Sequence, residues 1–568
     1  MTTRRRSAKT ERILRASALI GLLLFLLIQV FPIVRDFAKE PYRVLTREEI
    51  RQRAEALAVE RFGADDPSRI VSIDVTYLSD SLAVGYFSKH GLLDDYDKTW
   101  DDQFPADRYL AELRLNDGSR LLLSFHMESG NLVAWKHEPK NVEDGSAPSV
   151  RPEDALSWAA NWGIRPDEWT PAAPTDRETA REQVFRHRGS PVGEADLLLV
   201  VRPPASGAAE GDFAGGKIAY RYELPEAFAA EIRRQEKLAD RWMALGSLLP
   251  QSMMLLLAIV YAFLYGKYSS FRRGLFLAVF AFFAYSAVMA NMLPGFGAEL
   301  LAEDLVVDDL VIFFTMVVSI LASMFIAVLT YFSAVAGDGL WNRMDPGARL
   351  WPRWHGADYG ERVYDAMKRG YLGAFILLGL QSGIFLALRE GVGSFVTTDV
   401  TQTTYNMAYP WLFPLLGWWA AISEEIQIRF FGIGIMRLWL IGLAALLLRG
   451  APSARTAAVL TWLAMIPPNL VWAFGHVGYS IYPVYSRLIE LVLLGFVIGW
   501  FMLRYGLMTV IFAHAALDGI LIGLQLLTDG MPGDEWAAAV SMASPALVGW
   551  AIFRLHRRLH RNPADPAA

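Results

Sequence analysis

The chain of 568 residues contains no cysteine. Without a thiol it cannot carry a nucleophilic cysteine, a disulfide, a thiolate metal site or a palmitoyl group. It also has no excess of basic residues, and its formal net charge of -5 gives no indication of a nucleic-acid partner. The composition is instead apolar, with 53% hydrophobic residues and a mean hydropathy of +0.26. Such values are typical of a multi-span membrane protein and not of a soluble enzyme.

The N-terminus combines a basic segment with a long apolar run. The run extends from about Ala16 to Val34, and no small-x-small cleavage site follows it. The basic residues before it are Arg4, Arg5, Arg6, Lys9, Arg12 and Arg15. Because the run is longer than the apolar region of a cleaved signal peptide, the pattern predicts an uncleaved signal-anchor helix over residues 13–35. Its basic end is expected in the cytoplasm.

Residues 36–240 are charged and mixed, and they predict an inserted α+β domain. A capping box, Thr46-Arg-Glu-Glu49, opens an amphipathic helix that runs to about Arg61. The expected strands are Arg69–Leu78, Ala83–Ser88, the hairpin Tyr109–Ser124, Ala195–Val201 and Lys217–Leu224. The pattern restarts near Ser149. Two helix-plus-meander repeats and one irregular α+β domain both fit this order.

From Met243 onward, long apolar runs alternate with charged loops. The candidate membrane spans lie near residues 243–266, 274–293, 310–335, 371–388, 406–437, 456–479, 485–503, 505–527 and 537–553. We assign residues 241–400 to accessory spans, 401–555 to a core that carries the ionisable clusters, and 556–568 to a basic tail. The predicted fold class is therefore a mainly α-helical polytopic membrane bundle with an inserted α+β domain.

Loop charges orient the spans. Basic residues gather in alternate loops and after the last span, and include Lys267, Arg272, Arg273, Arg343, Arg362, Arg369, Arg554, Arg557 and Arg558. By the positive-inside rule, both termini are expected in the cytoplasm of a bacterial-type inner membrane, with residues 36–240 on the extracytoplasmic side. Residues 406–449 are too long for one span and lack a loop for two. We expect one crossing to about Arg437, followed by a re-entrant or interfacial segment over 438–449.

Ionisable residues interrupt the apolar runs at three places. These are Glu424-Glu425 with Arg429, then His476, then His514 with Asp518. A charge at the centre of a bilayer costs at least about 2.5 kcal/mol, so an ionisable residue in a span is by default a functional hypothesis. Of nine histidines, only His476 and His514 lie within apolar runs.

The first cluster separates two carboxylates. Adjacent helical residues point about 100° apart, so Glu424 and Glu425 cannot share one environment. Glu425 and Arg429 are i,i+4 neighbours and can form an ion pair. This leaves Glu424 without a local partner, as suits a general base. The alternative is a structural Glu–Arg bridge, with Glu424 facing a water-filled cavity.

The two histidines each have a helical neighbour. Trp472 and His476 share a face downstream of Pro467-Pro468, which breaks the helix and frees backbone carbonyls. His514 and Asp518 are also four residues apart, so the acid can fix the histidine tautomer or hold the same water. The structural alternatives are an interhelical hydrogen bond at His476 and a satisfied His–Asp pair between two helices.

Taken in order, the three clusters form EExxxR, aromatic-xxx-His and HxxxD. This pattern resembles the CAAX prenyl protease and bacteriocin-processing family of intramembrane proteases, type II CAAX endopeptidases, over about residues 406–527. The resemblance implies that Glu424 activates the attacking water and that His476 and His514 surround it. It further implies that Glu425 and Arg429 are a supporting acid and arginine, and that Asp518 supports the oxyanion together with His514.

Some positions depart from the family pattern. Trp472 stands where phenylalanine is usual, and the glycine that normally follows the arginine is displaced to Gly432. Zinc could be held by Glu424, His476 and His514. However, HExxH is absent, so we expect no required metal or other cofactor. Neither a GxSG serine motif nor a YD…GxGD aspartyl pair occurs in an apolar span.

The expected function is hydrolysis of a peptide bond in a membrane-associated protein or peptide, within the lipid bilayer. One alternative is a catalytically silent family member that acts as a membrane scaffold or as an immunity or binding protein. A second is a transporter or channel that uses buried acids for proton coupling, although the sequence shows no evident inverted repeat. Arg487 and Glu490, in the following span, are expected to form an i,i+3 interfacial pair.

Overall fold

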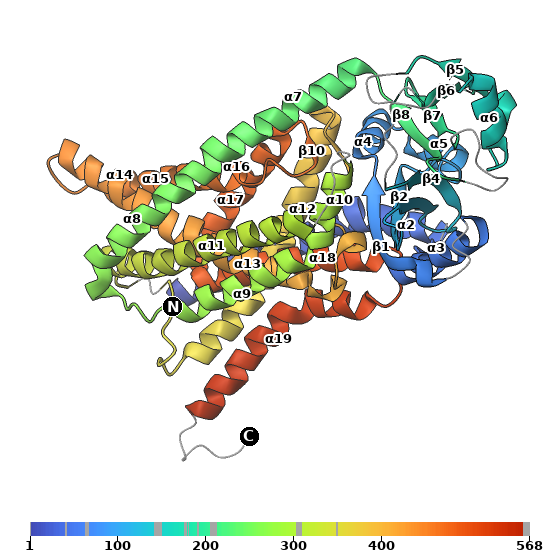
Figure 1. Ribbon diagram of the computed structural model, residues 1–568. Helices are drawn as coiled ribbons and strands as arrows, with labels where there is room; N and C mark the ends of the chain where they lie inside the picture. Colours follow the sequence, from blue (N-terminus) through green and yellow to red (C-terminus); the bar gives the residue numbers. More distant parts are fainter. Residues whose placement is uncertain are drawn as a thin grey trace.

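The structure is a computed structural model in which a sheet domain lies at one end of a long helical bundle (Figure 1). It describes residues 2–560 apart from 40–41, 63–66, 141–149, 175–178, 180, 190–191, 205–212, 303–308 and 348–349. Ser149 and the end of the predicted basic tail, 561–568, lie outside the described residues. The predicted fold class, a helical membrane bundle with an inserted α+β domain, is confirmed.

The sheet domain contains one antiparallel sheet with the strand order β1-β2-β3-β4-β8-β7-β6-β5. The strands are β1 (Ile70–Ser79), β2 (Asp107–Leu115), β3 (Arg120–His126), β4 (Leu132–Glu138), β5 (Trp169–Ala172), β6 (Gln183–His187), β7 (Asp196–Arg202) and β8 (Lys217–Glu223). Two four-stranded meanders thus meet at their last strands, and each follows a helix, α3 (Arg47–Arg61) or α6 (Pro152–Ala160). The domain therefore has two halves of like strand order that share one sheet.

Most local predictions in this domain agree with the structure. The Thr46–Glu49 capping box is present, and the β2–β3 turn places Gly118 at φ +84°. The predicted strand Ala83–Ser88 is wrong, because these residues belong to helix α4 (Ser81–His90). The Asp80 carboxylate accepts a hydrogen bond from the Ala83 N–H at its start, and α5 (Leu93–Thr99) follows it. A short apolar run fits both strand and helix periods, and the capping residue decides between them.

Nine helices among the described residues are long and apolar enough to cross a membrane, or ten if the bent pair α9–α10 counts as one span. Those before the clusters include α1 (Thr2–Phe25), α2 (Phe31–Lys39), α7 (Glu226–Met243), α8 (Leu249–Tyr265), α9 (Leu275–Asn291), α10 (Leu293–Ala302), α11 (Asp309–Met344) and α12 (Tyr359–Val392). Those that carry or follow the clusters are α13 (Pro414–Glu424), α14 (Ile433–Leu447), α15 (Ala454–Leu463), α16 (Ile466–Phe474), α17 (Tyr485–Tyr505), α18 (Leu507–Thr528) and α19 (Glu535–Leu559).

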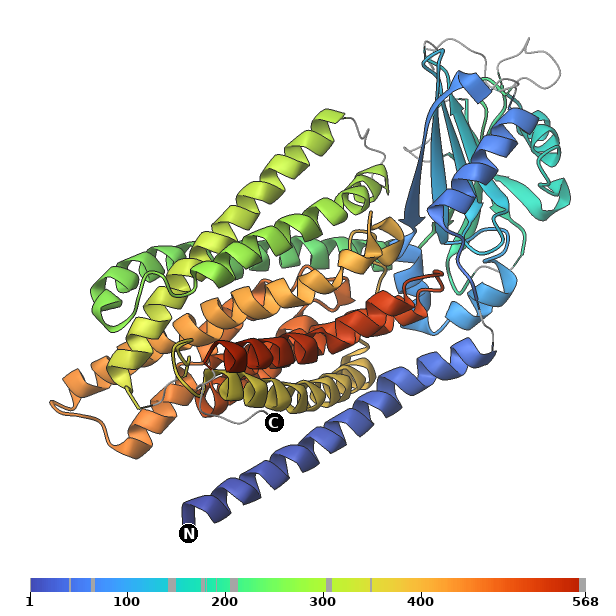
Figure 2. The same ribbon diagram turned by 90° about the horizontal axis from the view of Figure 1, so that it is seen from below.

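The predicted signal-anchor helix is an integral member of the bundle. α1 crosses α12 so closely that a Cβ atom on Gly21 would lie 2.2 Å from the carbonyl oxygen of Phe375. Small residues permit this kind of approach between membrane helices. The N-terminal end of α1 and the C-terminal end of α19 both lie on the side of the bundle away from the sheet domain (Figure 2).

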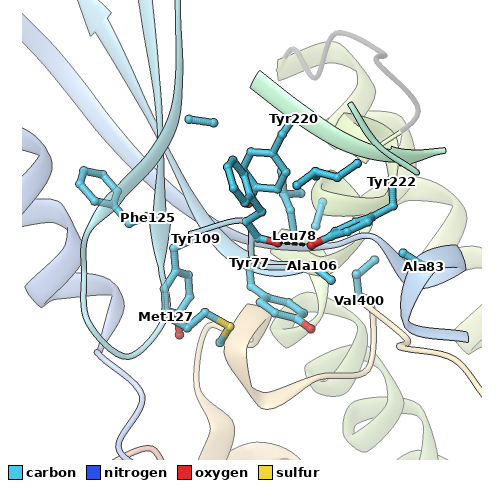
Figure 3. Close-up of a cluster of buried hydrophobic side chains, with 14 of the residues drawn as sticks. Tyr77, Leu78, Ala83, Ala106, Tyr109, Phe125, Met127, Tyr220, Tyr222 and Val400 are labelled. Atoms are coloured by element: carbon cyan, nitrogen blue, oxygen red, sulfur yellow. Dashed lines mark hydrogen bonds between the residues drawn. The ribbon is translucent and has the colours of Figure 1, made fainter. Parts of the chain in front are cut away.

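The domain and the bundle share buried contacts. The side chain of Val400, from the loop after α12, lies in the same core as Tyr77 and Tyr222 (Figure 3). Asn406 is fully buried beside strand β1. It accepts a hydrogen bond from the Tyr77 N–H (2.8 Å) and donates to the carbonyl oxygens of Tyr77 (3.0 Å) and Val400 (2.9 Å). Moreover, helix Glu226–Tyr268 runs without a break from the domain into the bundle, so the predicted boundary at residue 240 lies inside it.

The segment 438–449, which was expected to be re-entrant or interfacial, is helical as far as Leu447. The helical run Pro410–Leu447 continues through these residues, and the chain returns through α15 after a short turn. Leu446 and Leu447 near its end are exposed, as expected for side chains that face lipid. The helix is simply longer than a membrane requires, which the absence of a loop in 406–449 already indicated.

Candidate intramembrane active site

The two adjacent glutamates lie where an α-helix widens into a π-helix. α13 ends at Glu424, and the π-helix η8 (Glu425–Gly432) begins at the next residue. π-helical segments are rare, and those that occur inside α-helices are often located at functional sites. The two carboxylates face different surroundings, as predicted: the Glu424 side chain is 15% exposed, whereas Glu425 is fully buried.

Glu425 interacts with two buried side chains. Its Oε1 lies 3.4 Å from Nη1 of Arg429, the predicted i,i+4 partner, and accepts a hydrogen bond of 2.8 Å from Nδ1 of His514. Arg429 is fully buried, and its guanidinium lies 3.8 Å from the centroid of the Trp472 ring. Glu425 therefore both neutralises Arg429 and fixes the His514 ring.

Glu424 approaches both histidines. Its Oε1 lies 3.6 Å from Nε2 of His476, and its Oε2 lies 4.0 Å from Nε2 of His514. The Oε2 atom also accepts a hydrogen bond from the indole N–H of Trp472. This partner is distant in the sequence and was not predicted, because the sequence indicated only that Glu424 lacks a partner on its own helix. The signal was the tryptophan at a position where phenylalanine is usual, since only tryptophan brings an N–H donor.

His476 lies in the turn that follows a short helix, two residues after its end. α16 starts at Ile466, with Pro467 in its first turn, and ends at Phe474. The predicted span 456–479 was thus too long, but the predicted break near Pro467-Pro468 is present. Nδ1 of His476 lies 2.8 Å from the carbonyl oxygen of Trp472. A carbonyl oxygen can only accept, so Nδ1 carries a proton, and Nε2 is the ring nitrogen that faces Glu424.

His514 and Asp518 lie one turn apart on α18, with Nε2 of His514 3.4 Å from Oδ2 of Asp518. Because Glu425 holds Nδ1, His514 has a carboxylate beside each ring nitrogen. A proton on each nitrogen satisfies both carboxylates. All six residues singled out from the sequence therefore lie in one cluster formed by α13, η8, the turn after α16, and α18.

The cluster opens into a cavity of about 370 Å³ inside the bundle. Glu424, His476, His514 and Asp518 line it, while Glu425 and Arg429 lie behind the wall. The volume is within the range of ligand-binding cavities. The alternative interpretation of the sequence, a structural Glu–Arg bridge beside a water-filled cavity, also accounts for part of this arrangement. It does not account for two imidazoles within 4.0 Å of Glu424.

Two residues of the cavity wall were missed as possible site residues. The Tyr479 ring stacks on the His476 ring with their centroids 5.6 Å apart, and the Arg487 guanidinium lies 5.1 Å from the centroid of the Tyr479 ring. His476 and Tyr479 lie after the end of α16, where the chain turns before α17 begins at Tyr485, so helical periodicity does not apply across this segment. No sequence periodicity could therefore have placed them at the site.

Zinc binding by Glu424, His476 and His514 was considered from the sequence. Zinc ligands hold the ion at about 2.0–2.2 Å, so their donor atoms must converge on one point. Within the part of the chain that the structure describes, no group of three His, Asp or Glu side chains is arranged to do so. The donor set as arranged does not fit the ion, and no step below is assigned to a metal.

Comparisons with protein families, with curated proteins and with solved structures gave no match. The resemblance to CAAX-type proteases therefore rests on the motif residues themselves and stays a prediction.

Proposed function

We propose that the protein is an intramembrane endopeptidase that hydrolyses a peptide bond of a membrane-associated protein or peptide with a water molecule activated by Glu424. The observation that carries this proposal is the position of the Glu424 carboxylate, which lines a cavity inside the bundle 3.6 and 4.0 Å from two imidazole nitrogens. A water molecule among these three groups is within reach of each of them.

The proton inventory supports a direct attack by this water. In the neutral ring of His476, Nδ1 donates to the Trp472 carbonyl and Nε2 is the acceptor. The water gives one hydrogen bond to His476 and the other to Glu424, which leaves an oxygen lone pair for the scissile carbonyl carbon. Glu424 takes the proton as the C–O bond forms. It then delivers this proton to the amide nitrogen as the C–N bond breaks.

His514 is assigned to the oxyanion. With Nδ1–H donating to Glu425, a second proton on Nε2 can donate to the carbonyl oxygen as negative charge develops there. Asp518 stabilises that protonated ring from 3.4 Å. Surrounding protein and lipid keep the dielectric constant low, which strengthens a donor aimed at developing charge.

The proposal includes a membrane orientation. Both termini lie in the cytoplasm of a bacterial-type inner membrane, and the sheet domain is extracytoplasmic. The ends of α1 and α19 on the side away from the sheet domain, together with the basic loops, support this orientation. A large extracytoplasmic domain suits capture of an extracytoplasmic protein, and nothing in the chain indicates a prenylated substrate.

The test uses full-length protein in lipid vesicles and membrane-tethered peptides, with cleavage read by mass spectrometry. Glu424→Ala, His476→Ala and His514→Ala are each expected to abolish cleavage that the wild type performs. Glu390→Gln, which changes an exposed acid at the end of α12, is the matched control and retains cleavage. Retained cleavage in the Glu424 variant would refute the mechanism.

One observation favours a second candidate, a catalytically silent scaffold or binding protein. The Trp472 indole donates to Glu424, and this hydrogen bond occupies an oxygen that a general base would use. A scaffold would keep its cellular function in the Glu424→Gln variant, whereas a protease would lose it.

A further inference from the structure

An arginine that the proposed hydrolysis does not use lines the same cavity. Arg487 belongs to the first turn of α17. This helix follows strand β10 (Ile481–Tyr482), which pairs with β9 (Phe395–Val396). Gln402, from the loop that contacts the sheet domain, lines the cavity as well. Arg487 therefore marks the part of the cavity that faces the sheet domain.

The arginine is held in place by a buried network. Its Nη1 lies 2.6 Å from Oε2 of Glu490, which is fully buried, and Oε1 of Glu490 accepts a hydrogen bond of 2.7 Å from Nε2 of Gln381. The predicted i,i+3 pair is thus present, and its arginine lines the cavity. Both oxygens of Glu490 are engaged, so the guanidinium has a fixed position.

The guanidinium keeps unused donors. It has five N–H groups, and its buried Nε–H has no hydrogen-bond partner among the described residues. Its side chain is 15% exposed. The Nε–H is shielded from the cavity, so a ligand with an anionic acceptor would reach the guanidinium through the exposed part of the side chain, at the Nη atoms.

The arginine is also close to the reacting groups. Its guanidinium lies 5.1 Å from the Tyr479 ring centroid, and that ring lies 5.6 Å from the His476 ring. The distance from the Arg487 guanidinium to the centroid of the His476 ring is therefore at most the sum of these two distances. About three residues of extended peptide cover that length.

We propose that Arg487 recognises a carboxylate of the substrate within about three residues of the scissile bond. A guanidinium binds a carboxylate with two parallel hydrogen bonds, which gives geometric selectivity as well as attraction. The carboxylate can be an acidic side chain or the C-terminus of the substrate. This inference rests on the proposed function and adds a substrate class to it: peptides with an acid next to the cleaved bond.

The experiment measures kcat/KM for a series of membrane-tethered peptides with wild-type protein in vesicles. One arm places Asp or Asn at each of three positions on either side of the cleaved bond. A second arm compares a free C-terminal carboxylate with an amide at the same distances. The wild type is expected to prefer one acidic register by about 10- to 100-fold, the range for a charge-assisted hydrogen bond.

Variants then test whether Arg487 causes the preference for an acidic residue. Arg487→Ala is expected to collapse the acid-to-neutral ratio toward one, chiefly through KM, and Arg487→Lys to retain part of it. Because Arg487→Ala leaves Glu490 buried without a cation, the double variant Arg487→Gln with Glu490→Gln repeats the test without an unpaired charge. Arg389→Ala, at an exposed arginine near the end of α12, is the matched control and leaves the ratio unchanged.

The outcomes separate the two claims. If the wild type cleaves no peptide of either series, the proposed function fails. If it cleaves all of them at equal rates, or if the Arg487 variants keep the acid preference, the function stands and the role of Arg487 is refuted. A ratio that changes only when anionic lipid is added would assign Arg487 to a lipid phosphate, and would also refute the proposal.

Discussion

The sheet domain and the helical bundle bury opposite kinds of side chain. The domain encloses a compact apolar core that includes Phe87, Tyr109 and Phe125. The bundle presents large apolar residues on its outside, such as Leu446, and buries Glu425 and Arg429 completely. In water, removal of apolar surface drives folding. In lipid, apolar contact is available everywhere, so the interior can hold polar groups that satisfy one another. The domain interior provides stability, whereas the bundle interior is available for chemistry.

The largest expected change comes from breaking the buried ion pair of the bundle. Arg429→Ala leaves the Glu425 carboxylate buried without a cation, which should lower the free energy of unfolding by about 3–5 kcal/mol. Thermal unfolding of the full-length protein in detergent measures this. The double variant Glu425→Gln with Arg429→Gln should recover most of the stability but not the cleavage. Equal loss of stability in the single and double variants would contradict the ion-pair account.

A smaller loss is expected where the two regions meet. Asn406→Ala removes the partner of the buried Tyr77 N–H at the edge of β1, and a buried unsatisfied donor costs about 1–3 kcal/mol. Tryptophan fluorescence during thermal unfolding should show the sheet domain melting earlier. Asn161→Ala, at an exposed asparagine after α6, should change little. An unchanged melting curve for Asn406→Ala would mean that this contact does not hold the domain.

The sheet domain should show a modest pH dependence from one histidine. The hydrogen bond from His126 to Asp101 raises the pKa of His126, although burial opposes the shift. A raised pKa means that protonated His126 stabilises the fold below its unfolded value of about 6.5, and that this contribution is lost as the pH rises through the folded value. The stability difference between wild type and His126→Gln should therefore shrink as the pH is raised. The exposed His90→Gln is the control, and a growing difference would reverse the assignment.

Metal removal should have the smallest effect. Because no three donors are arranged for an ion among the described residues, dialysis against a chelator is expected to leave cleavage of a tethered peptide unchanged. Loss of cleavage that returns on addition of zinc would assign metal binding to the cavity and replace Glu424 as the sole activator of water.

The sequence predicted which ionisable residues form the cluster better than it predicted what surrounds them. Residues separated by one helical turn, such as Glu425 and Arg429 or His514 and Asp518, follow from helical periodicity. The cost of charge in lipid marked His476 without any periodicity. These signals are local or compositional, and the sequence contains them in full.

The missed features depend on contacts between distant segments. The Trp472 hydrogen bond to Glu424 joins two helices, and the approach of Arg487 to His476 depends on a turn between α16 and α17. Asn406 likewise meets Tyr77 only because the sheet domain packs on the bundle. In the strand predicted over Ala83–Ser88, the apolar pattern was ambiguous, and the capping residue Asp80 carried the decisive signal.

The most direct test of the central claim compares two properties of the Glu424→Gln variant in one preparation. Glu424 is a partly exposed residue of the cavity wall, so its neutral isostere should unfold at the wild-type temperature or above it. Loss of the general base should reduce cleavage of a tethered peptide by about 10²- to 10⁴-fold. Cleavage at the wild-type rate by the folded variant would contradict the assignment of hydrolysis to this cavity.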